Sequence, residues 1–272
     1  MTEEQLEKAS ESKSGLLRAL SVLSLISDRS PETLGVSTIA RELDLPKAVA
    51  HRILKEFTAA SFLVFDDRTK QYRLGPDALA VGMAALRSLD VPRIARPHLQ
   101  SLVTETKETA TLSVRNGWSR VYVDQILSPH EIRMAISLGT THPLHAGSSS
   151  KAILAHLGDA EVEEYLELSR LERVTSSTIT DVGALRTELD RVRETGYAVS
   201  LGERQAGAGS VAAPVHRASG EVFGSISLCG PRDRFDAEAC ERYGALVAAT
   251  AAQISKELGH RASGSTSGGV AS

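Results

Sequence analysis

Residues 37–74 read STIARELDLPKAVAHRILKEFTAASFLVFDDRTKQYRL, and this stretch decides the fold of the first part of the chain. Apolar residues recur at helical spacing up to Leu43, and a second periodic run contains Ile53, Leu54 and Phe57. Pro46 suits the first turn of the second helix, where its missing N–H costs nothing. Two short helices joined by a tight turn predict a helix-turn-helix, whose second helix can enter a DNA major groove.

The residues after the second helix predict a basic β-hairpin, or wing. Residues 62–65 are typical of a strand, residues 66–70 form a polar turn, and residues 71–74 predict the returning strand. Cations on the second helix and on this wing could bind phosphates, and an arginine could reach the O6 and N7 atoms of a guanine. Two surface helices with ordinary solvated charges are the alternative interpretation.

Bulk properties limit the classes of protein that this chain can belong to. The 272 residues suffice for one large or two small domains. The net charge of −3 means that affinity for DNA must come from a local basic cluster. The two cysteines, Cys229 and Cys240, are too few for a disulfide framework. The acidic start and the lack of a long apolar run lead us to expect a cytoplasmic protein without a membrane partner.

Changes of period and turn residues divide the chain into segments. Residues 1–12 are polar and are expected to be disordered, and residues 262–272 form a tail rich in Gly and Ser. Between them we expect a winged helix-turn-helix domain, a linker helix and a larger α+β domain, over residues 13–74, 75–91 and 92–261. The linker is rich in small residues, which suits pairing with a partner chain, although a core helix would have the same composition.

The first domain is expected to open with an amphipathic helix that ends near Ser27, followed by a loop over residues 28–35. Ser37 is a plausible N-cap of the next helix. A break at residues 90–92 separates the linker from a helix over residues 93–106.

Beyond residue 109 the pattern changes from helical to alternating, which predicts strands. Asn116-Gly117 is a strong tight-turn signal, Asp181 suits a helix start, and Gly196 suits a helix stop. The expected strands cover residues 111–115, 121–126, 132–136, 197–201, 210–216 and 222–229. The expected helices cover residues 148–157, 159–168, 182–194 and 236–258. Strands in hairpins with flanking helices predict an α+β domain built on an antiparallel sheet.

The segment A-R-E-L-D-L-P-K-A-V-A-H-R-I-L, with the hairpin and Y-R-L-G after it, resembles the IclR family of bacterial transcription regulators. That family commonly has Gly-Leu-Pro-Lys-Ser-Thr-Val-His-Arg-Leu-Leu here, so Asp44, Ala48 and Val49 depart from it. The last two departures remove hydroxyl groups that could contact DNA, which leaves the operator sequence open. Further on, P-L-H-A-G-S-S-S-K-A-I-L-A, T-I-T-D, G-Y-A-V, V-A-A-P-V and S-I-S-L-C-G-P resemble, in order, the family's GAF-like effector-binding domain.

The resemblance implies a ligand-responsive regulator, more often a repressor, that binds double-stranded operator DNA. It implies a homodimer, often doubled into a homotetramer, that reads palindromic half-sites roughly 34 Å apart. It adds a basic residue of the first helix, Arg18, for which a solvated helix face is the alternative. The residues expected to contact DNA are Arg18, Ser37, Lys47, Ala48, His51, Arg52, Lys55, Arg68, Lys70 and Arg73.

The resemblance also implies a small-molecule effector, and no cofactor, in a pocket on one side of the sheet. A helix N-terminus near Ser148 could bind a carboxylate, strand hydroxyls could orient it, and apolar residues could fill the remainder. Many relatives carry an acid where Ser200 stands, Cys where Ser210 stands and Gly where Ser150 stands. We therefore expect a pocket less polar than in regulators of small oxo-acids, suited to an aromatic or aliphatic carboxylic acid. The implied pocket residues are Met134, Leu138, Leu144, Ser148, Ser149, Ser200, Ser210, Ser227 and Cys229.

Two other classes of function compete with the regulator. His142 and His145, with His156 nearby and Cys229, could form a metal or redox sensor, but their spacing does not place two imidazoles one helical turn apart. A small-molecule enzyme with an incidental basic hairpin is the second alternative. It is weaker because neither a G-x-S-x-G elbow nor a phosphate-binding loop occurs.

Overall fold

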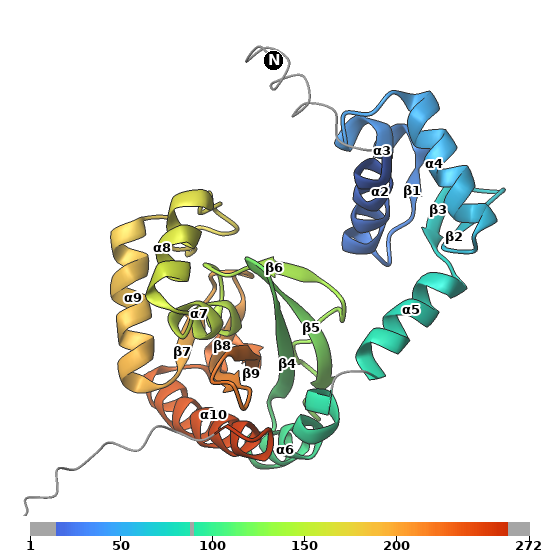
Figure 1. Ribbon diagram of the computed structural model, residues 1–272. Coiled ribbons are helices and arrows are strands. Elements are labelled where there is room, and N and C mark those ends of the chain that lie inside the picture. The colour runs from blue at the N-terminus through green and yellow to red at the C-terminus, as the bar shows by residue number, and fades with distance from the viewer. Residues whose placement is uncertain (1–14, 88–89, 261–272) are drawn as a thin grey trace, which may run out of the picture. The chain divides into compact units, whose positions relative to one another are not determined.

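The structure of the protein, a computed structural model, describes residues 15–87 and 90–260. It divides into two compact units, Met1–Ser88 and Leu89–Ser272, which are considered separately (Figure 1). The predicted disordered segment 1–12 and the tail 262–272 lie outside the described residues. Within those residues, no helix combines the length and apolar character needed to cross a bilayer.

The first unit is the predicted winged helix-turn-helix. Its elements are α2 (Gly15–Arg29), β1 (Leu34–Gly35), α3 (Val36–Glu42), α4 (Lys47–Ala59), β2 (Leu63–Asp66), β3 (Gln71–Leu74) and α5 (Pro76–Arg87). The strands form a three-stranded antiparallel sheet in the order β1-β3-β2. Apolar residues from the helices and the sheet, among them Val22, Ile39, Leu54 and Tyr72, form one core that fixes α4.

Two expectations for this unit are wrong in detail. Residues 28–35 are not entirely a loop, because α2 runs to Arg29 and Leu34–Gly35 pairs with β3. Ser37 is not the N-cap of α3, since Gly35 takes that place without a side-chain capping bond. The turn before α4 contains Asp44 at φ +50°, a left-handed conformation that glycine adopts most easily and that Asp tolerates better than most residues.

The second unit is an α+β domain built on a six-stranded antiparallel sheet in the order β6-β5-β4-β9-β8-β7. Its first elements are α6 (Asp90–Thr106), β4 (Thr109–Asn116), β5 (Ser119–Ile126), β6 (Thr141–Pro143), α7 (Ser148–Ala155) and α8 (Asp159–Leu168). Then follow α9 (Val182–Thr195), β7 (Ala198–Leu201), β8 (Ala208–His216), β9 (Val222–Pro231), a short 3-10 turn (Arg232–Arg234) and α10 (Ala237–Glu257). The predicted fold class is confirmed.

Alternation along the strands gives the two faces of this sheet different chemistry. On β9, Ile226 and Leu228 belong to the core beneath α6 and α10, whereas Ser225 and Ser227 belong to the opposite face. Helices α7, α8 and α9 lie on that opposite face (Figure 1). Small hydroxyl residues there allow the backbone of α7 to approach closely, and the Ser225 hydroxyl donates to the carbonyl of Ser149 at 3.1 Å.

Several predicted helix and strand boundaries hold, and two do not. Gly117 has φ +57° in the turn between β4 and β5, the Asp181 carboxylate caps α9, and Gly196 ends α9 at φ +79°. The helix expected from residue 93 begins at Asp90 instead. Residues 132–136 are not a strand: the side-chain amide of Gln125 bonds to both the N–H and the carbonyl of Ile136 and takes the place of a backbone ladder.

Candidate nucleic-acid interface and ligand pocket

One face of α4 carries the basic residues predicted to read DNA. Ala50, Ile53 and Leu54 are buried against the rest of the first unit, which turns the other face of the helix to solvent. The exposed side chains on that face are Lys47, Ala48, His51, Arg52 and Lys55. Within the part of the chain that the structure describes, Lys47, Arg52 and Lys55 form no ion pair, so their charges are available to an anionic partner.

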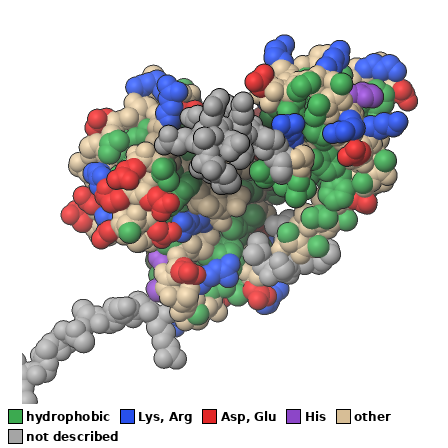
Figure 2. Space-filling view, turned by 45° about the horizontal axis from the view of Figure 1, so that its top comes forward, with side chains coloured by type: hydrophobic (Ala, Val, Ile, Leu, Met, Phe, Trp, Pro, Cys, Tyr) green, Lys and Arg blue, Asp and Glu red, His purple; other side chains and the backbone are tan. Residues whose placement is uncertain are grey.

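The wing adds exposed cations to the same unit. Arg68 and Lys70 lie in the turn between β2 and β3, and Arg73 is exposed on β3. The carboxylate of Asp66 accepts hydrogen bonds from the N–H groups of Arg68 and Thr69 and so shapes the turn. Figure 2 shows Lys and Arg side chains gathered on this unit. Such an array of cations beside a helix-turn-helix suits a phosphate backbone.

The surroundings of the two remaining predicted DNA contacts, Arg18 and Ser37, say less about their role. Arg18 is half-buried on α2, and Ser37 is exposed in the first turn of α3. Since Ser37 does not cap its helix, its hydroxyl is not committed to that bond. Contact of any of these ten residues with DNA stays a prediction.

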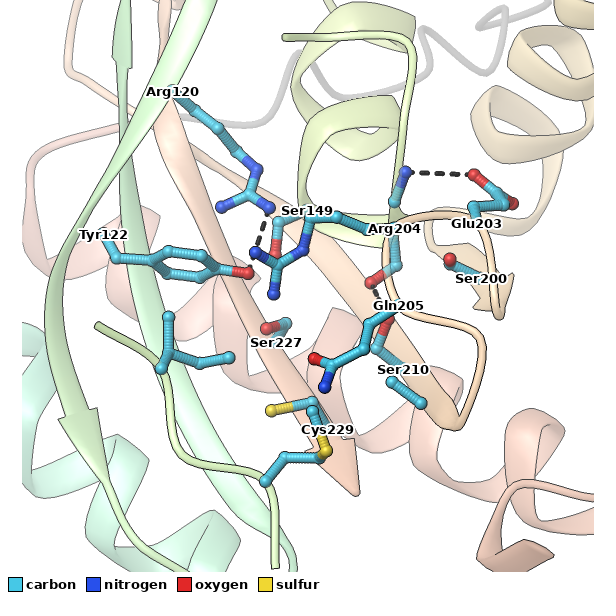
Figure 3. Close-up of a pocket in the computed structure, with 15 residues that line it drawn as sticks. Arg120, Tyr122, Ser149, Ser200, Glu203, Arg204, Gln205, Ser210, Ser227 and Cys229 are labelled. Carbon is cyan, nitrogen blue, oxygen red and sulfur yellow. Dashed lines mark hydrogen bonds between the residues drawn. The ribbon is translucent and has the colours of Figure 1, made fainter. Parts of the chain in front are cut away.

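A pocket lies in the second unit between the sheet and the start of α7 (Figure 3). It holds a small cavity of about 30 Å³. Seven predicted residues line it: Met134, Ser148, Ser149, Ser200, Ser210, Ser227 and Cys229. The rest of its lining consists of Arg120, Tyr122, Ile136, Gly147, Glu203, Arg204, Gln205 and Ala208.

Two predicted pocket walls lie elsewhere. Leu144 is fully buried, but it packs in the core under α7, α8 and α9. Leu138 is 51% exposed and does not line the cavity. Charged groups are present instead of these apolar walls, so the lining is more polar than the sequence led us to expect.

Arg120 is the most deeply buried charge in this lining, with 1% of its surface exposed. Its guanidinium donates to the hydroxyls of Ser150 at 2.8 Å, Ser113 at 2.9 Å and Tyr122 at 3.0 Å. These three partners are neutral. Burial lowers the pKa of Arg120, and the nearby charge of Arg204 adds to this effect.

Arg204 reaches the same point from the loop between β7 and β8. The guanidinium carbons of Arg120 and Arg204 lie 4.2 and 5.3 Å from the centroid of the Tyr122 ring. Figure 3 shows the two guanidiniums side by side near the hydroxyl end of that ring. Arg204 also donates to Nε2 of His142 at 2.9 Å. Burial and the two arginine charges lower the pKa of His142 to about 3, which keeps its ring neutral and able to accept this bond.

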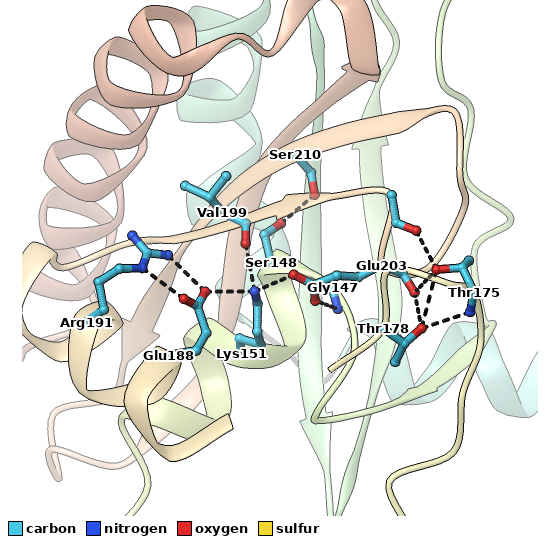
Figure 4. Close-up of polar contacts among 11 residues, drawn as sticks. Gly147, Ser148, Lys151, Thr175, Thr178, Glu188, Arg191, Val199, Glu203 and Ser210 are labelled. Carbon is cyan, nitrogen blue, oxygen red and sulfur yellow. Dashed lines mark hydrogen bonds and ion pairs between the residues drawn. The ribbon is translucent and has the colours of Figure 1, made fainter. Parts of the chain in front are cut away.

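The carboxylate of Glu203 is held by the start of α7 (Figure 4). It accepts from the N–H of Gly147 at 3.0 Å and from Nζ of Lys151 at 2.5 Å. Lys151, 1% exposed, also donates to Glu188 at 2.8 Å and to the carbonyl of Val199 at 2.7 Å. This buried network joins the start of α7 to the loop that carries Arg204, and so fixes the shape of the pocket.

Hydroxyl pairs complete the polar lining. The Ser148 hydroxyl donates to that of Ser210 at 2.7 Å, and the hydroxyls of Thr111 and Ser227 are 2.7 Å apart. The first N–H groups of α7 have no partner within their own helix and are directed toward its N-terminal end. With the guanidiniums, they make this cavity suited to an anion.

Some residues of the pocket had a detectable sequence signal. In residues 120–123 Arg and Tyr alternate with two valines, so a strand must place Arg120 and Tyr122 on one face. Arg204 and Gln205 lie in a loop, where no periodicity reveals the direction of a side chain.

The alternative of a metal or redox sensor finds little support in this geometry. Both ring nitrogens of His145 are within 3.0 Å of partners in the protein, the Tyr165 hydroxyl and the Glu172 carbonyl. His142 bonds Arg204 and Thr140, and His156 lies in a different part of the unit, near His216. Among the described residues, no three His, Cys, Asp or Glu side chains converge as metal ligands. Burial raises the pKa of the Cys229 thiol to about 12.

Comparison with known proteins finds a matching domain family for each of the two units. Residues 15–67 match the IclR helix-turn-helix domain, and residues 83–256 match the bacterial transcriptional regulator IclR C-terminal domain. The chain is 32% identical over 247 residues to the HTH-type transcriptional repressor AllR of Escherichia coli K12, covering 91% of each chain. It is 36% identical over 214 residues to the HTH-type transcriptional regulator BhcR of Paracoccus denitrificans, covering 79% of this chain and 76% of that one.

A solved structure is similar over nearly the whole length. An IclR homologue from Microbacterium hydrocarbonoxydans, complexed with 4-hydroxybenzoate, superposes with a TM-score of 0.72 at 26% identity and covers 90% of this chain and 99% of its own. These relatives are transcription regulators and not enzymes. The two matched domains, the winged helix-turn-helix and the antiparallel-sheet domain together establish that the chain belongs to the IclR family of bacterial transcriptional regulators.

Proposed function

We propose that this protein is a repressor whose affinity for a palindromic operator changes when a small carboxylate binds in the pocket at the start of α7. It acts as a homodimer, or as a pair of dimers, because two-fold symmetry presents two copies of α4 to half-sites about one helical turn apart. The observation that carries the effector part is the small cavity at the start of α7, lined by serine hydroxyls and two guanidiniums.

The size of the cavity favours a small ligand. An ordered water needs roughly 10–15 Å³ of such volume, so about 30 Å³ accommodates few atoms unless the lining moves. Of the aromatic and aliphatic acids expected from the sequence, this supports a compact aliphatic acid. The complex of a relative with 4-hydroxybenzoate supports a carboxylate as the recognised group.

The DNA-binding part rests on the exposed basic face of α4. Arg52 and Lys55 lie on it beside His51, all directed away from the core of the first unit. In a major groove, an arginine on this face can bond a guanine, and the wing cations can bond phosphates. Repression is the proposed outcome because AllR is named a repressor.

Effector binding acts by shifting the population of two arrangements of the dimer. The ligand stabilises one of them through its contacts with α7 and the loop of Arg204, and that arrangement holds the two α4 helices at a different spacing. Coupling of this kind typically amounts to about 1–3 kcal/mol, or a change of roughly 5- to 150-fold in operator affinity.

The test is fluorescence anisotropy of labelled DNA from upstream of the protein's own gene, and of sites selected from random DNA, at several salt concentrations. We expect selective binding that weakens steeply with salt, and a shift in affinity when small carboxylates are added. Arg52→Ala should weaken operator binding about 5- to 150-fold. Arg242→Ala, an exposed arginine of α10, removes the same charge away from α4 and should not.

Two results would contradict the proposal. If no selected DNA binds better than random sequence, with or without acids, the protein is not an operator-binding repressor. If Arg52→Ala keeps full affinity, α4 does not read the operator through that residue.

A further inference from the structure

The pocket contains two positive charges without a matching negative charge. Within the described residues, neither Arg120 nor Arg204 forms an ion pair, and the partners of Arg120 are three neutral hydroxyls. The guanidinium of Arg204 donates to the ring of His142, which is neutral. A guanidinium buried in this way is unfavourable unless an anion accompanies it.

Glu203, the one acid among the described residues that line the pocket, is not available to neutralise them. Glu203 is 7% exposed, and its carboxylate is bonded to Lys151 and to the N–H of Gly147. Behind it, Glu188 bonds both Lys151 and Arg191, at 2.8 Å in each case. The charges of this network therefore cancel among themselves, and the two guanidiniums at the cavity remain unmatched.

Both guanidiniums have N–H groups that can donate further hydrogen bonds to a ligand. Arg120 donates three hydrogen bonds to hydroxyls, and Arg204 donates one to His142. A guanidinium carries more N–H groups than either arginine uses in these bonds. Their planar forks match the two oxygens of a carboxylate. Because they lie 4.2 and 5.3 Å from one ring centroid, a short molecule can reach both.

We infer that the effector carries two acidic groups on a short skeleton, a small dicarboxylate, with one group bound by Arg120 and the other by Arg204. This inference rests on the proposed function, since it specifies the charge of the carboxylate that binds in the same pocket. The two guanidiniums lie side by side at the Tyr122 ring, and their positions set the spacing of the acidic groups. The small cavity restricts the skeleton to a few atoms.

Isothermal calorimetry on the full chain tests this with pairs of ligands of the same shape. The diacids are oxalate, malonate, succinate and glutarate, and each is compared with its half-amide, in which a neutral amide replaces one carboxylate. We expect at least one diacid to bind about tenfold or more tightly than its half-amide. The same diacid should shift operator affinity in the anisotropy assay.

Two variants test whether the arginines cause the preference for a diacid over its half-amide. Arg204→Gln should reduce the preference for the diacid over the half-amide to nearly nothing. Arg242→Gln is the matched control, because Arg242 also lies over a tyrosine ring, that of Tyr243 at 4.9 Å, but outside the pocket. This variant should prefer the diacid as strongly as the unmodified protein does. Circular dichroism confirms that both variants remain folded.

The outcomes separate the two proposals. If half-amides bind as tightly as diacids and still shift operator affinity, the dianion inference is overturned while the proposed function stands. If Arg204→Gln retains the full preference, the arginine pair does not create it. If no acid binds or changes operator affinity, the carboxylate effector and the dianion both fail.

Discussion

Replacement of Lys151 by Met tests the buried network that fixes the pocket. Lys151 is 1% exposed and donates to Glu188, Glu203 and the carbonyl of Val199. Met fills a similar volume but removes the charge and all three bonds. The carboxylate of Glu203, whose side chain is 8% exposed, then loses its cationic partner and keeps one bond, from Gly147.

The expected cost follows from leaving a buried charge unpaired. Removal of one partner of a buried ion pair typically destabilises a protein by about 3–5 kcal/mol, because the remaining ion stays without water and without compensation. Since Glu188 keeps Arg191, we attribute most of this loss to Glu203. The double variant Lys151→Met, Glu203→Gln removes both charges and should lose less than the sum of the single variants.

Urea unfolding followed by Trp118 fluorescence measures this loss. Trp118 is the only tryptophan of the chain, and it packs on Tyr165 at a ring distance of 5.7 Å, so its emission reports on the second unit alone. Arg186→Met, which breaks a half-exposed pair with Glu163, serves as control and should hardly move the midpoint. A loss below about 1 kcal/mol for Lys151→Met would refute the argument that Glu203 is buried and charged.

Three further predictions concern other parts of the second unit. Burial, with the neighbouring His156 and His260, lowers the pKa of His216 to about 4, so the unfolded chain binds a proton at this ring more readily than the folded protein does. The free energy of unfolding should therefore fall as the pH drops from about 6.5 to 4. His216→Gln should flatten the dependence of the urea midpoint on pH. Cys229, with its thiol pKa raised by burial to about 12, should react with Ellman's reagent at pH 8 only after unfolding, and rapid reaction of the native protein would reopen the redox alternative. Gly224→Ala should strongly lower the midpoint because its Cβ would lie 2.0 Å from the carbonyl oxygen of Ser113, whereas Gly207→Ala, with nothing within 4 Å, should have little effect; equal effects would contradict this packing argument.

Much of the fold was predictable because it depends on local pattern. The helical periodicity before and after Asp44 identified α3 and α4, and Asn116-Gly117 identified the β4–β5 turn. The failed strand at residues 132–136 shows the limit of such reasoning. Its alternation is genuine, but a side chain from Gln125 meets the backbone of Ile136, and no local pattern reveals a partner eleven residues away.

The candidate pocket was predictable in part for a similar reason. Ser148 and Ser149 could be placed because they begin a helix, and Ser227 and Cys229 because alternate residues of a strand share a face. Leu138 and Leu144 were misplaced because hydrophobicity alone does not distinguish a ligand-facing wall from a core. The charge balance escaped prediction, since it depends on which cation Glu203 contacts, and Lys151 lies far from it along the chain.

The attachment of Ile136 through Gln125 has a consequence for how such regulators diversify. Met134 and Ile136 line the cavity, yet their segment is held to the sheet by side chains and not by a strand ladder: Gln125 bonds Ile136, and the Thr109 hydroxyl donates to the carbonyl of Met134 at 2.7 Å. Substitutions there can resize the floor of the pocket without disturbing the register of any strand. A few changes in this segment of a duplicated gene would therefore alter which small molecule fits the pocket, while the helix-turn-helix unit is inherited intact.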